Sequence, residues 1–382
     1  MPIASLCSAR ERLYKLMAMA DTDDDILFGR EGAVATVTLN RPRALNAFTL
    51  EMYRAFDPKL REWAADPAVQ AVVVRGAEGR AFCAGGDIRA IYDAGKGISG
   101  DPSLTSTFFR EEYQLIRRIH RYPKPYIAII DGITMGGGAG VSVNGAFRIA
   151  TEQTMFAMPE TGIGLFPDVG ATRFLNLCPG QVGRYIGLTG ARLGPGDALA
   201  CGFATHFVRR ERIPSLMAAL TRVTWRAGRQ RAQVDEVLAA FRTTLGEAPL
   251  EGQRAGIDRC FAGDTVEGIL GTLGSDRALG GREGEWATET LSALVGKSPT
   301  SLKVTLRQLM VGQGLEIEAA LALEYRLTQH MMAGHDFYEG VRATLVDKDQ
   351  KPQWQPATLA AVTEEMVDAY FAPLDDDELR FD

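Results

Sequence analysis

Two isolated carboxylates follow a glycine-rich turn near the middle of the chain. Glu160 and Asp168 lie in segments that otherwise carry almost no charge. Because an acid in apolar surroundings without a partner is costly to bury, such a group is usually present for chemistry. The three glycines at 136–138 follow an apolar run, which is typical of a strand that turns into a helix and leaves backbone N–H groups free to face a ligand. Free N–H groups beside buried acids predict an oxyanion site with an acid or base partner.

The elements expected to position these groups alternate between strands and helices. Residues 34–39 alternate between apolar and polar types, whereas 71–76 and 127–130 are short runs rich in valine or isoleucine, and all three are typical of strands. Apolar residues recur every three or four positions over 48–64, which predicts a helix. The glycine, proline and serine content of 94–104 predicts a mobile surface loop. This order of elements predicts an α/β fold with buried sheets.

The last third of the chain has a different character. Helical spacing recurs in the segments 212–241, 287–296, 300–311 and 316–333, and strand signals are few. A short alternating stretch at 341–346 is expected to interrupt these helices.

The composition argues against several classes of protein. The chain has 382 residues, 46% hydrophobic and 24% charged, which suits one large domain with an elaboration or two domains. A net charge of −6 argues against a binder of nucleic acid or of anionic membranes, and no apolar run reaches the ~18 residues of a membrane span. Five scattered cysteines without a C-x-x-C pair, and four histidines without ligand spacing, favour a reducing compartment and no metal site. We expect a cytoplasmic protein in a bacterium, or a mitochondrial matrix protein in a eukaryote.

Four ordered motifs resemble the crotonase (enoyl-CoA hydratase/isomerase) superfamily, and together they are much more specific than any one of them. They are LNRPRALNA at 39–47, AFCAGGDI at 81–88, MGGG at 135–138 and MPET at 158–161. Further segments are similar to the branch that hydrolyses 3-hydroxyisobutyryl-CoA, namely FFREEY at 108–113, AMPE at 157–160, LFPDVG at 165–170, GFATH at 202–206 and HDFYEGVRA at 335–343. The resemblance spans roughly residues 26–370.

The resemblance implies a crotonase-like spiral of ββα turns with a helical C-terminal region. We divide the chain accordingly into an N-terminal extension at 1–25, a CoA-thioester core at 26–225 and a mainly helical region at 226–382. Two backbone N–H groups, those of Gly86 and Gly137, are implied to grip the thioester oxygen, where fixed dipoles stabilise the negative charge that develops on attack.

The resemblance also implies contacts to the substrate. The residues concerned are Arg43, Gly85, Asp87, Ile88, Arg89 and Glu112. The two arginines flank loops that lie against CoA in the superfamily, and guanidinium groups suit its phosphates. CoA is then part of the substrate and no separate cofactor is expected. The superfamily favours trimers and hexamers, so a homo-oligomer is compatible with the sequence.

Gly140 is the decisive departure from the hydratases of the superfamily. Those enzymes resemble one another in carrying a second glutamate just after the glycine turn, which acts with the glutamate at the position of Glu160 to add water across a double bond. In the hydrolase pattern, Glu160 and Asp168 serve thioester hydrolysis and Glu112 contacts the hydroxyacyl group. Glu160 either attacks the carbonyl to form an anhydride or deprotonates a water, while Asp168 orients that water or manages the proton.

The activity implied is hydrolysis of a short 3-hydroxyacyl-CoA thioester, 3-hydroxyisobutyryl-CoA in valine catabolism being the favoured substrate. One alternative is an enoyl-CoA hydratase or isomerase of the same superfamily, and another is a non-catalytic CoA-binding scaffold. Structural interpretations of the individual residues also stay open. The glycines could serve only close packing, Asp168 could cap a helix, and Glu112 could lie on a solvated helix face.

Overall fold

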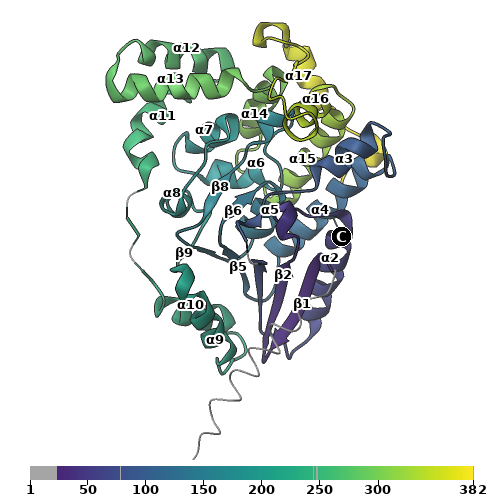
Figure 1. Cartoon of the computed structure of the whole chain (residues 1–382), viewed down its shortest axis with the longest axis vertical. Coiled ribbons are helices and arrows are strands. Elements are labelled where there is room, and N and C mark those ends of the chain that lie inside the picture. Colours follow the sequence, from purple (N-terminus) through teal and green to yellow (C-terminus); the bar gives the residue numbers. More distant parts are fainter. Residues whose placement is uncertain (1–23, 78, 244, 247, 382) are drawn as a thin grey trace, which may run out of the picture.

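A six-stranded sheet forms the centre of the molecule (Figure 1). The computed structural model describes residues 24–77, 79–243, 245–246 and 248–381, so residues 1–23 of the predicted extension lie outside the described residues. The strands, in their order across the sheet, are β1 (Ile26–Glu31), β2 (Val34–Leu39), β3 (Ala71–Gly76), β5 (Tyr126–Ile130), β7 (Phe147–Ala150) and β9 (His206–Phe207). β1 pairs antiparallel with β2, and every later pair is parallel.

A second sheet carries the glycine turns. It consists of β4 (Ala81–Cys83), β6 (Ile133–Met135) and β8 (Met155–Ala157), all parallel. Because the carboxyl ends of parallel strands meet at one edge, the segments that follow β4, β6 and β8 are brought together there. Those segments contain 85–86, 136–138 and Glu160.

Helices cover both faces of the six-stranded sheet, which explains why all five residues of β5 and the first four of β3 are apolar and buried. Val72, Val74, Ala128 and Ile130 belong to the main core together with residues of α2 (Leu50–Ala65) and α4 (Leu104–His120). The alternate side chains of the same strands pack on the opposite face against α9 (Ile213–Thr221) and α10 (Gln230–Ala239). The boundary that we drew at 225 therefore runs between two helices of one hydrophobic cluster.

The predicted elements of the core are present. Strands occupy 34–39, 71–76 and 126–130. The helix predicted from 48 begins at Leu50, because the Thr49 side chain caps it by accepting from the Met52 N–H, while Phe48 instead forms a bridge to Gly86. Between the end of α3 (Ile88–Gly95) and the start of α4 the chain has no regular structure, in agreement with the loop predicted at 94–104.

The C-terminal region is mainly helical, as predicted. After α10 its α-helices are α11 (Arg254–Cys260), α12 (Val266–Arg277), α13 (Gly281–Val295), α14 (Pro299–Val311), α15 (Ile317–Met332), α16 (Asp336–Val341) and α17 (Glu364–Tyr370). Figure 1 shows α12 and α13 side by side at one corner, α14, α16 and α17 above α4 and α6 (Ala171–Phe174), and α15 level with α6. Across the described ranges, no helix is both long enough and apolar enough to cross a membrane.

The prediction that the alternating stretch at 341–346 interrupts the helices was wrong. Val341 ends α16, and Arg342–Val346 continue directly as a π-helix. The Arg342 guanidinium binds the carboxylates of Glu339 at 2.8 Å, Asp347 at 2.7 Å and Asp349 at 2.8 Å, so ion pairs hold this segment in a helical turn. Tertiary contacts of this kind override a weak local strand pattern.

Candidate active site

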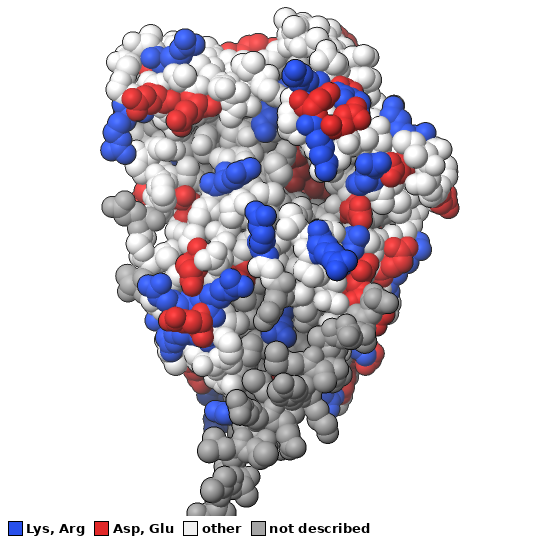
Figure 2. Space-filling model, in the orientation of Figure 1, with Lys and Arg blue, Asp and Glu red and all other residues white. Residues whose placement is uncertain are grey.

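A small cavity of about 80 Å³ lies where the two glycine turns meet α4 and the segment between β8 and α6. The residues that line it include Gly85, Gly86, Ile88, Phe108, Phe109, Glu112, Gly136, Gly137, Glu160, Leu165, Asp168 and Val169. On the face seen in Figure 2, acidic atoms lie deep in a hollow, with Lys and Arg side chains on the surrounding surface.

The two glycine turns touch backbone to backbone. A Cβ built on Gly136 would lie 3.4 Å from the Gly85 Cα, and one on Gly137 would lie 3.4 Å from the Gly85 carbonyl carbon. Gly85 and Gly136 also have φ values of 120° and 48°, in the region that favours glycine. The φ values therefore explain glycine at 85 and 136, whereas at 137 a Cβ would lie only 2.7 Å from the Glu112 Oε1.

Each glycine turn presents a backbone N–H to the cavity. Phe48 donates to the Gly85 carbonyl at 2.9 Å and accepts from Asp87 at 2.7 Å, which turns the N–H of the intervening Gly86 to the other side of the chain. Gly137 is the first residue of α5 (Gly137–Val143), so its N–H has no acceptor within the helix. Both donors predicted for the oxyanion site therefore belong to residues that line one cavity.

Three carboxyl groups reach the same cavity, and all three are buried. Glu112 from α4 accepts a hydrogen bond from the Tyr53 hydroxyl at 2.5 Å. Asp168 accepts one from the Tyr113 hydroxyl at 2.6 Å. Glu160 begins the 3₁₀ turn Glu160–Ile163, and its buried Oε2 has no hydrogen-bond partner within the described part of the chain. A buried carboxylate oxygen without a partner is available to a substrate or to a water.

Burial is the main influence on the ionisation of these groups. It raises the pKa of Glu112 and of Glu160 well above the usual range, and the neighbouring charge of Asp168 adds to the effect in both. Burial also raises the pKa of Asp168, to about 6, although the Tyr113 hydrogen bond opposes it. Carboxyl groups with raised pKa values are suited to accept protons near neutral pH.

Asp168 is held in a strained turn by residues outside it. Val169 has φ 57°, which is unfavourable for a β-branched residue, and Gly170 follows with φ 92°. The Asn144 side chain donates to the Val169 carbonyl at 3.1 Å. Glu324 of α15 accepts from the N–H groups of Gly170 at 2.7 Å and Thr172 at 2.8 Å. Glu324 thus satisfies the start of α6, and the Asp168 side chain, which makes no cap bond to that helix, faces the cavity.

The segment at 335–343 packs against the turn that carries Glu160. A Cβ on Gly340 would lie 2.4 Å from the carbonyl carbon of Ile163, and one on Gly164 would lie 2.1 Å from the Asp336 carbonyl oxygen. Only glycine allows α16 to approach the turn this closely. This contact explains why a motif distant in sequence belongs to the same site.

Gly140 is buried in α5, and neighbouring side chains fill the space that a side chain at this position would need. A Cβ there would meet Cδ1 of Ile116 and Cβ of Val169, each at 2.8 Å. The position that carries the second glutamate in the hydratase pattern is therefore a packed apolar contact in this chain.

We expect Gly140→Ala to destabilise the protein. Overpacking of a filled core typically costs about 1–3 kcal/mol, which exceeds the roughly 0.5–1 kcal/mol that alanine gains over glycine in a helix. The matched control is Gly271→Ala in α12, where a Cβ would meet nothing within 4 Å and stability should rise. Urea denaturation of both variants makes the comparison, and a stabilised Gly140→Ala variant would show that the contact yields easily.

Comparison with known proteins decides the family. A family model described as enoyl-CoA hydratase/isomerase matches residues 34–371. The chain belongs to the enoyl-CoA hydratase/isomerase family. It is 45% identical over 380 residues to the mitochondrial 3-hydroxyisobutyryl-CoA hydrolase of Danio rerio, a match that covers 99% of this chain and 97% of the relative. The enzyme of the same name from Homo sapiens is 44% identical over 366 residues, covering 94% and 92%.

Solved structures of similar proteins share the fold but carry other names. A carnitinyl-CoA dehydratase from Mycobacterium thermoresistibile matches with a TM-score of 0.84 and 41% identity over 94% of this chain and 99% of its own. An enoyl-CoA hydratase from Rhodobacter sphaeroides matches with a TM-score of 0.84 and 39% identity over 94% and 100%. These matches confirm the crotonase-like α/β fold with a helical C-terminal region.

The structure brings together most of the site residues predicted from the family motifs. Gly85, Gly86, Ile88, Glu112, Gly137, Glu160 and Asp168 all line the cavity. Asp87 instead caps α3 by accepting from Ala90 at 3.3 Å and pairs with Arg41 at 3.1 Å. Arg43 is exposed, and Arg89 is exposed and pairs with Asp93 at 2.9 Å, so their contacts to CoA stay predictions.

Several residues that shape the site were not singled out from the sequence. The Tyr53 hydroxyl donates to Glu112 on α4, and the Tyr113 hydroxyl donates to Asp168, which precedes α6. Glu324 accepts from the Gly170 N–H and so stabilises the turn that carries Asp168. Lys297 is largely buried, and its charge lowers the pKa of Glu160 against the effect of burial. A signal for Glu324 was present, since it falls among the apolar positions of a helical segment.

We expect Tyr113→Phe to move the acid limb of the pH–rate profile to higher pH. The hydroxyl donates to Asp168 and lowers its pKa, so its removal raises that pKa further and the ionised form appears later as pH rises. Hydrogen bonds to charged groups contribute about 1.5–3 kcal/mol, enough for a measurable shift. Tyr122→Phe, which removes a hydroxyl bonded to the Leu60 carbonyl, is the control. Identical profiles for the two variants would contradict the assignment.

Proposed function

We propose that this chain hydrolyses a short 3-hydroxyacyl-CoA thioester, with 3-hydroxyisobutyryl-CoA as its substrate, to give 3-hydroxyisobutyrate and CoA. The observation that carries the proposal is a Glu160 oxygen and two backbone N–H groups, those of Gly86 and Gly137, which have no hydrogen-bond partner among the described residues, combined with the apolar contact at Gly140. The curated relatives named as this hydrolase support it, since the chain covers nearly all of their length.

The reaction begins with attack on the thioester carbonyl. The N–H groups of Gly86 and Gly137 hold the carbonyl oxygen as it becomes negative. In one route Glu160 takes a proton from water, and the resulting hydroxide adds to the carbonyl carbon. The tetrahedral intermediate then expels CoA as a thiolate, which takes up a proton. Asp168, hydrogen bonded to Tyr113, orients the water or receives the proton.

In the second route Glu160 is itself the nucleophile. Its oxygen forms a bond to the carbonyl carbon, the C–S bond breaks, and CoA leaves before water cleaves the mixed anhydride. Both routes place Glu160 at the reacting carbon. Glu112 lies beside the same glycine turn, since its Oε1 is 2.7 Å from the position of a Cβ on Gly137. From there Glu112 and the Tyr53 hydroxyl bound to it contact the hydroxyl of the acyl group.

A hydratase is the second candidate, because the two solved relatives are named as a dehydratase and a hydratase. Addition of water to a double bond requires a second acid or base that polarises the water on the reacting face. In the hydratase pattern this group is the glutamate at the position of Gly140. Here Ile116 and Val169 occupy that space, which favours hydrolysis.

The wild-type protein can be tested directly with two thioesters. We expect rapid release of CoA from 3-hydroxyisobutyryl-CoA, measured with a thiol reagent, and negligible loss of the enoyl-thioester absorbance of crotonyl-CoA. The opposite pair of results would make the protein a hydratase, and inactivity with both would favour a binding protein. Because one methyl group is worth only about 1–3 kcal/mol in a pocket, 3-hydroxypropionyl-CoA belongs in the same panel.

The remaining functional expectations are part of the proposal. The reaction needs no cofactor beyond the CoA of its substrate. The Lys and Arg side chains around the hollow in Figure 2 suit the phosphates of CoA, and Arg43 and Arg89 are the residues proposed to bind them. The protein acts in the bacterial cytoplasm, or in the mitochondrial matrix if its source is eukaryotic, since the vertebrate relatives are named as mitochondrial enzymes. Nucleic acids and membranes are not among its partners, and it assembles with copies of itself if it is oligomeric.

A further inference from the structure

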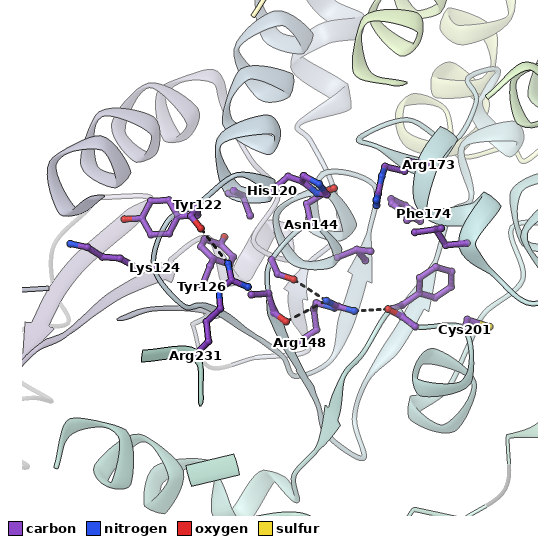
Figure 3. Close-up of a pocket in the computed structure, with 17 residues that line it drawn as sticks. His120, Tyr122, Lys124, Tyr126, Asn144, Arg148, Arg173, Phe174, Cys201 and Arg231 are labelled. Atoms are coloured by element: carbon purple, nitrogen blue, oxygen red, sulfur yellow. Dashed lines mark hydrogen bonds between the residues drawn. The ribbon is translucent and has the colours of Figure 1, made fainter. Parts of the chain in front are cut away.

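A second and larger cavity, of about 360 Å³, lies at the opposite end of α5 from the thioester site. Gly137 at the first turn of α5 lines the catalytic cavity, whereas Val143 and Asn144 at its end line the second one. We call the second cavity the basic pocket. Its walls come from five parts of the chain, namely 119–126 from the end of α4 to the start of β5, 143–148 from the end of α5 into β7, 173–177 in and after α6, 201–203, and Arg231 of α10. Figure 3 labels residues from each of these parts.

The lining of the basic pocket is strongly one-sided in charge. It contains the basic residues His120, Lys124, Arg148, Arg173 and Arg231, and none of its seventeen residues is an aspartate or glutamate. Nearby acids are engaged outside the lining: Glu318 pairs with Arg117 at 3.2 Å and Arg121 at 2.8 Å, and Asp66 pairs with Arg30 at 3.2 Å. Four permanently charged side chains therefore surround the cavity without an acidic residue among them.

The hydrogen bonds of these cations go to neutral groups. Lys124 donates to the carbonyls of Trp63 at 2.5 Å and Asp66 at 2.6 Å. Arg148 donates to the carbonyls of Gly145 at 2.9 Å and Gly202 at 2.8 Å, and its buried Nε has no partner among the described residues. Arg231 reaches the Tyr122 carbonyl only at 3.5 Å.

Arg148 thus links the residues after α5 to Gly202 through backbone carbonyls, but no carboxylate among the described residues pairs with its charge. Arg173 has neither an ion pair nor a side-chain hydrogen bond in the described part of the chain, as the absence of dashed lines at its label in Figure 3 illustrates. A partly buried positive charge without a counter-ion is costly, and a bound anion would offset that cost.

We propose that the basic pocket binds a small organic anion with at least two negative charges, carried on phosphate or carboxylate groups. The guanidinium groups of Arg173 and Arg231 would bind these charges in a bidentate manner. Tyr122, Tyr126, Phe174 and Phe203 line the pocket beside the cations and would pack against the organic part. The volume falls within the range of about 300–1,000 Å³ that is usual for small-molecule sites. This site is independent of the proposed thioesterase activity.

Isothermal titration of the full-length protein tests the proposal. Pyrophosphate and citrate are titrated separately, at constant ionic strength and in the presence of saturating CoA, so that phosphate subsites of the catalytic cavity are already occupied. We expect at least one of the two anions to bind at a single site with a dissociation constant below about 1 mM. Pyrophosphate binding indicates a phosphate ester as the natural ligand, and citrate binding indicates a polycarboxylate.

Matched variants locate the binding. The double variant Arg173→Gln/Arg231→Gln removes two charges from the pocket and should weaken binding at least about tenfold. The control Arg222→Gln/Arg282→Gln removes two exposed charges elsewhere and should leave the dissociation constant within about twofold. Arg231 is itself exposed, so Arg231→Gln alone provides a variant that keeps the fold. Absence of binding by the wild type, or equal weakening in the pocket and control variants, would overturn the proposal.

Discussion

Replacement of Glu160 by glutamine is expected to lower kcat for thioester hydrolysis by at least about two orders of magnitude. The change removes the group that attacks the carbonyl or deprotonates the water, so both routes fail. Glutamine has nearly the same shape, and the carboxyl oxygen that it replaces has no hydrogen-bond partner in the described structure. The dissociation constant for CoA and the melting temperature should therefore stay close to the wild-type values.

The control for this variant is Glu289→Gln, which removes an exposed carboxylate on α13. Steady-state kinetics on 3-hydroxyisobutyryl-CoA are compared with CoA binding measured by calorimetry. Near-normal turnover by Glu160→Gln would show that this residue has no chemical role and would require a different base.

Asp168→Asn should reduce kcat by about tenfold to a hundredfold, without loss of stability. A helix cap would behave differently, because its removal costs about 0.5–2 kcal/mol of stability and has little effect on turnover. Here the carboxyl is buried and its folded-state pKa is raised to about 6. A folded pKa about two units above the unfolded value near 3.9 means that ionisation at pH 7 destabilises the fold by about 3 kcal/mol.

The sign of this effect makes the experiment decisive. The destabilisation is fully present above pH 6, decreases as pH falls from about 6 to about 4, and is absent below the unfolded pKa. The neutral asparagine should thus melt at or above the wild-type temperature at pH 7, and the difference should shrink toward pH 4. In the active wild type, one step in the rise of kcat with pH should lie near 6, where Asp168 loses its proton, and ionisation of Glu160, whose pKa burial also raises, adds a second step. A melting temperature well below wild type, with unchanged turnover, would return Asp168 to a structural role.

The sequence alone predicted those features that depend on residues close together in the chain. The alternation at 34–39 and the apolar run at 127–130 both predicted strands. A strand with one buried face alternates apolar and polar residues, whereas a strand that is covered on both faces is apolar along its length. Glu160 and Asp168 could be found because a charge in an apolar segment is costly. The glycine turns were equally visible, because glycine is the residue that most readily adopts the positive φ values of Gly85 and Gly136.

The partners of these groups could not be found in the same way. Tyr113 lies 55 residues from Asp168, and Glu324 lies 154 residues from Gly170, so packing of distant helices decides both contacts. The π-helix at Arg342–Val346 was missed for a related reason, because ion pairs of Arg342 stabilise it against a local alternating pattern. The basic pocket is likewise assembled from five separate segments, and although RRIHRYPK at 117–124 is rich in basic residues, the sequence does not show which other segments join it.

The filled space at Gly140 has an evolutionary consequence. Since Ile116 and Val169 both occupy the volume that a side chain at 140 would need, these three positions form one unit whose substitutions are not independent. Residues in contact commonly show coupling energies of about 0.5–3 kcal/mol, so the effect of a glutamate at 140 depends on what the other two positions hold. Room for a side chain at 140 requires a shorter side chain at 116 and a shift at 169, where the contact is to the Cβ that every residue except glycine carries. Epistasis of this kind imposes an order on a mutational path between hydrolase and hydratase chemistry, because a glutamate that arrives first meets an occupied site.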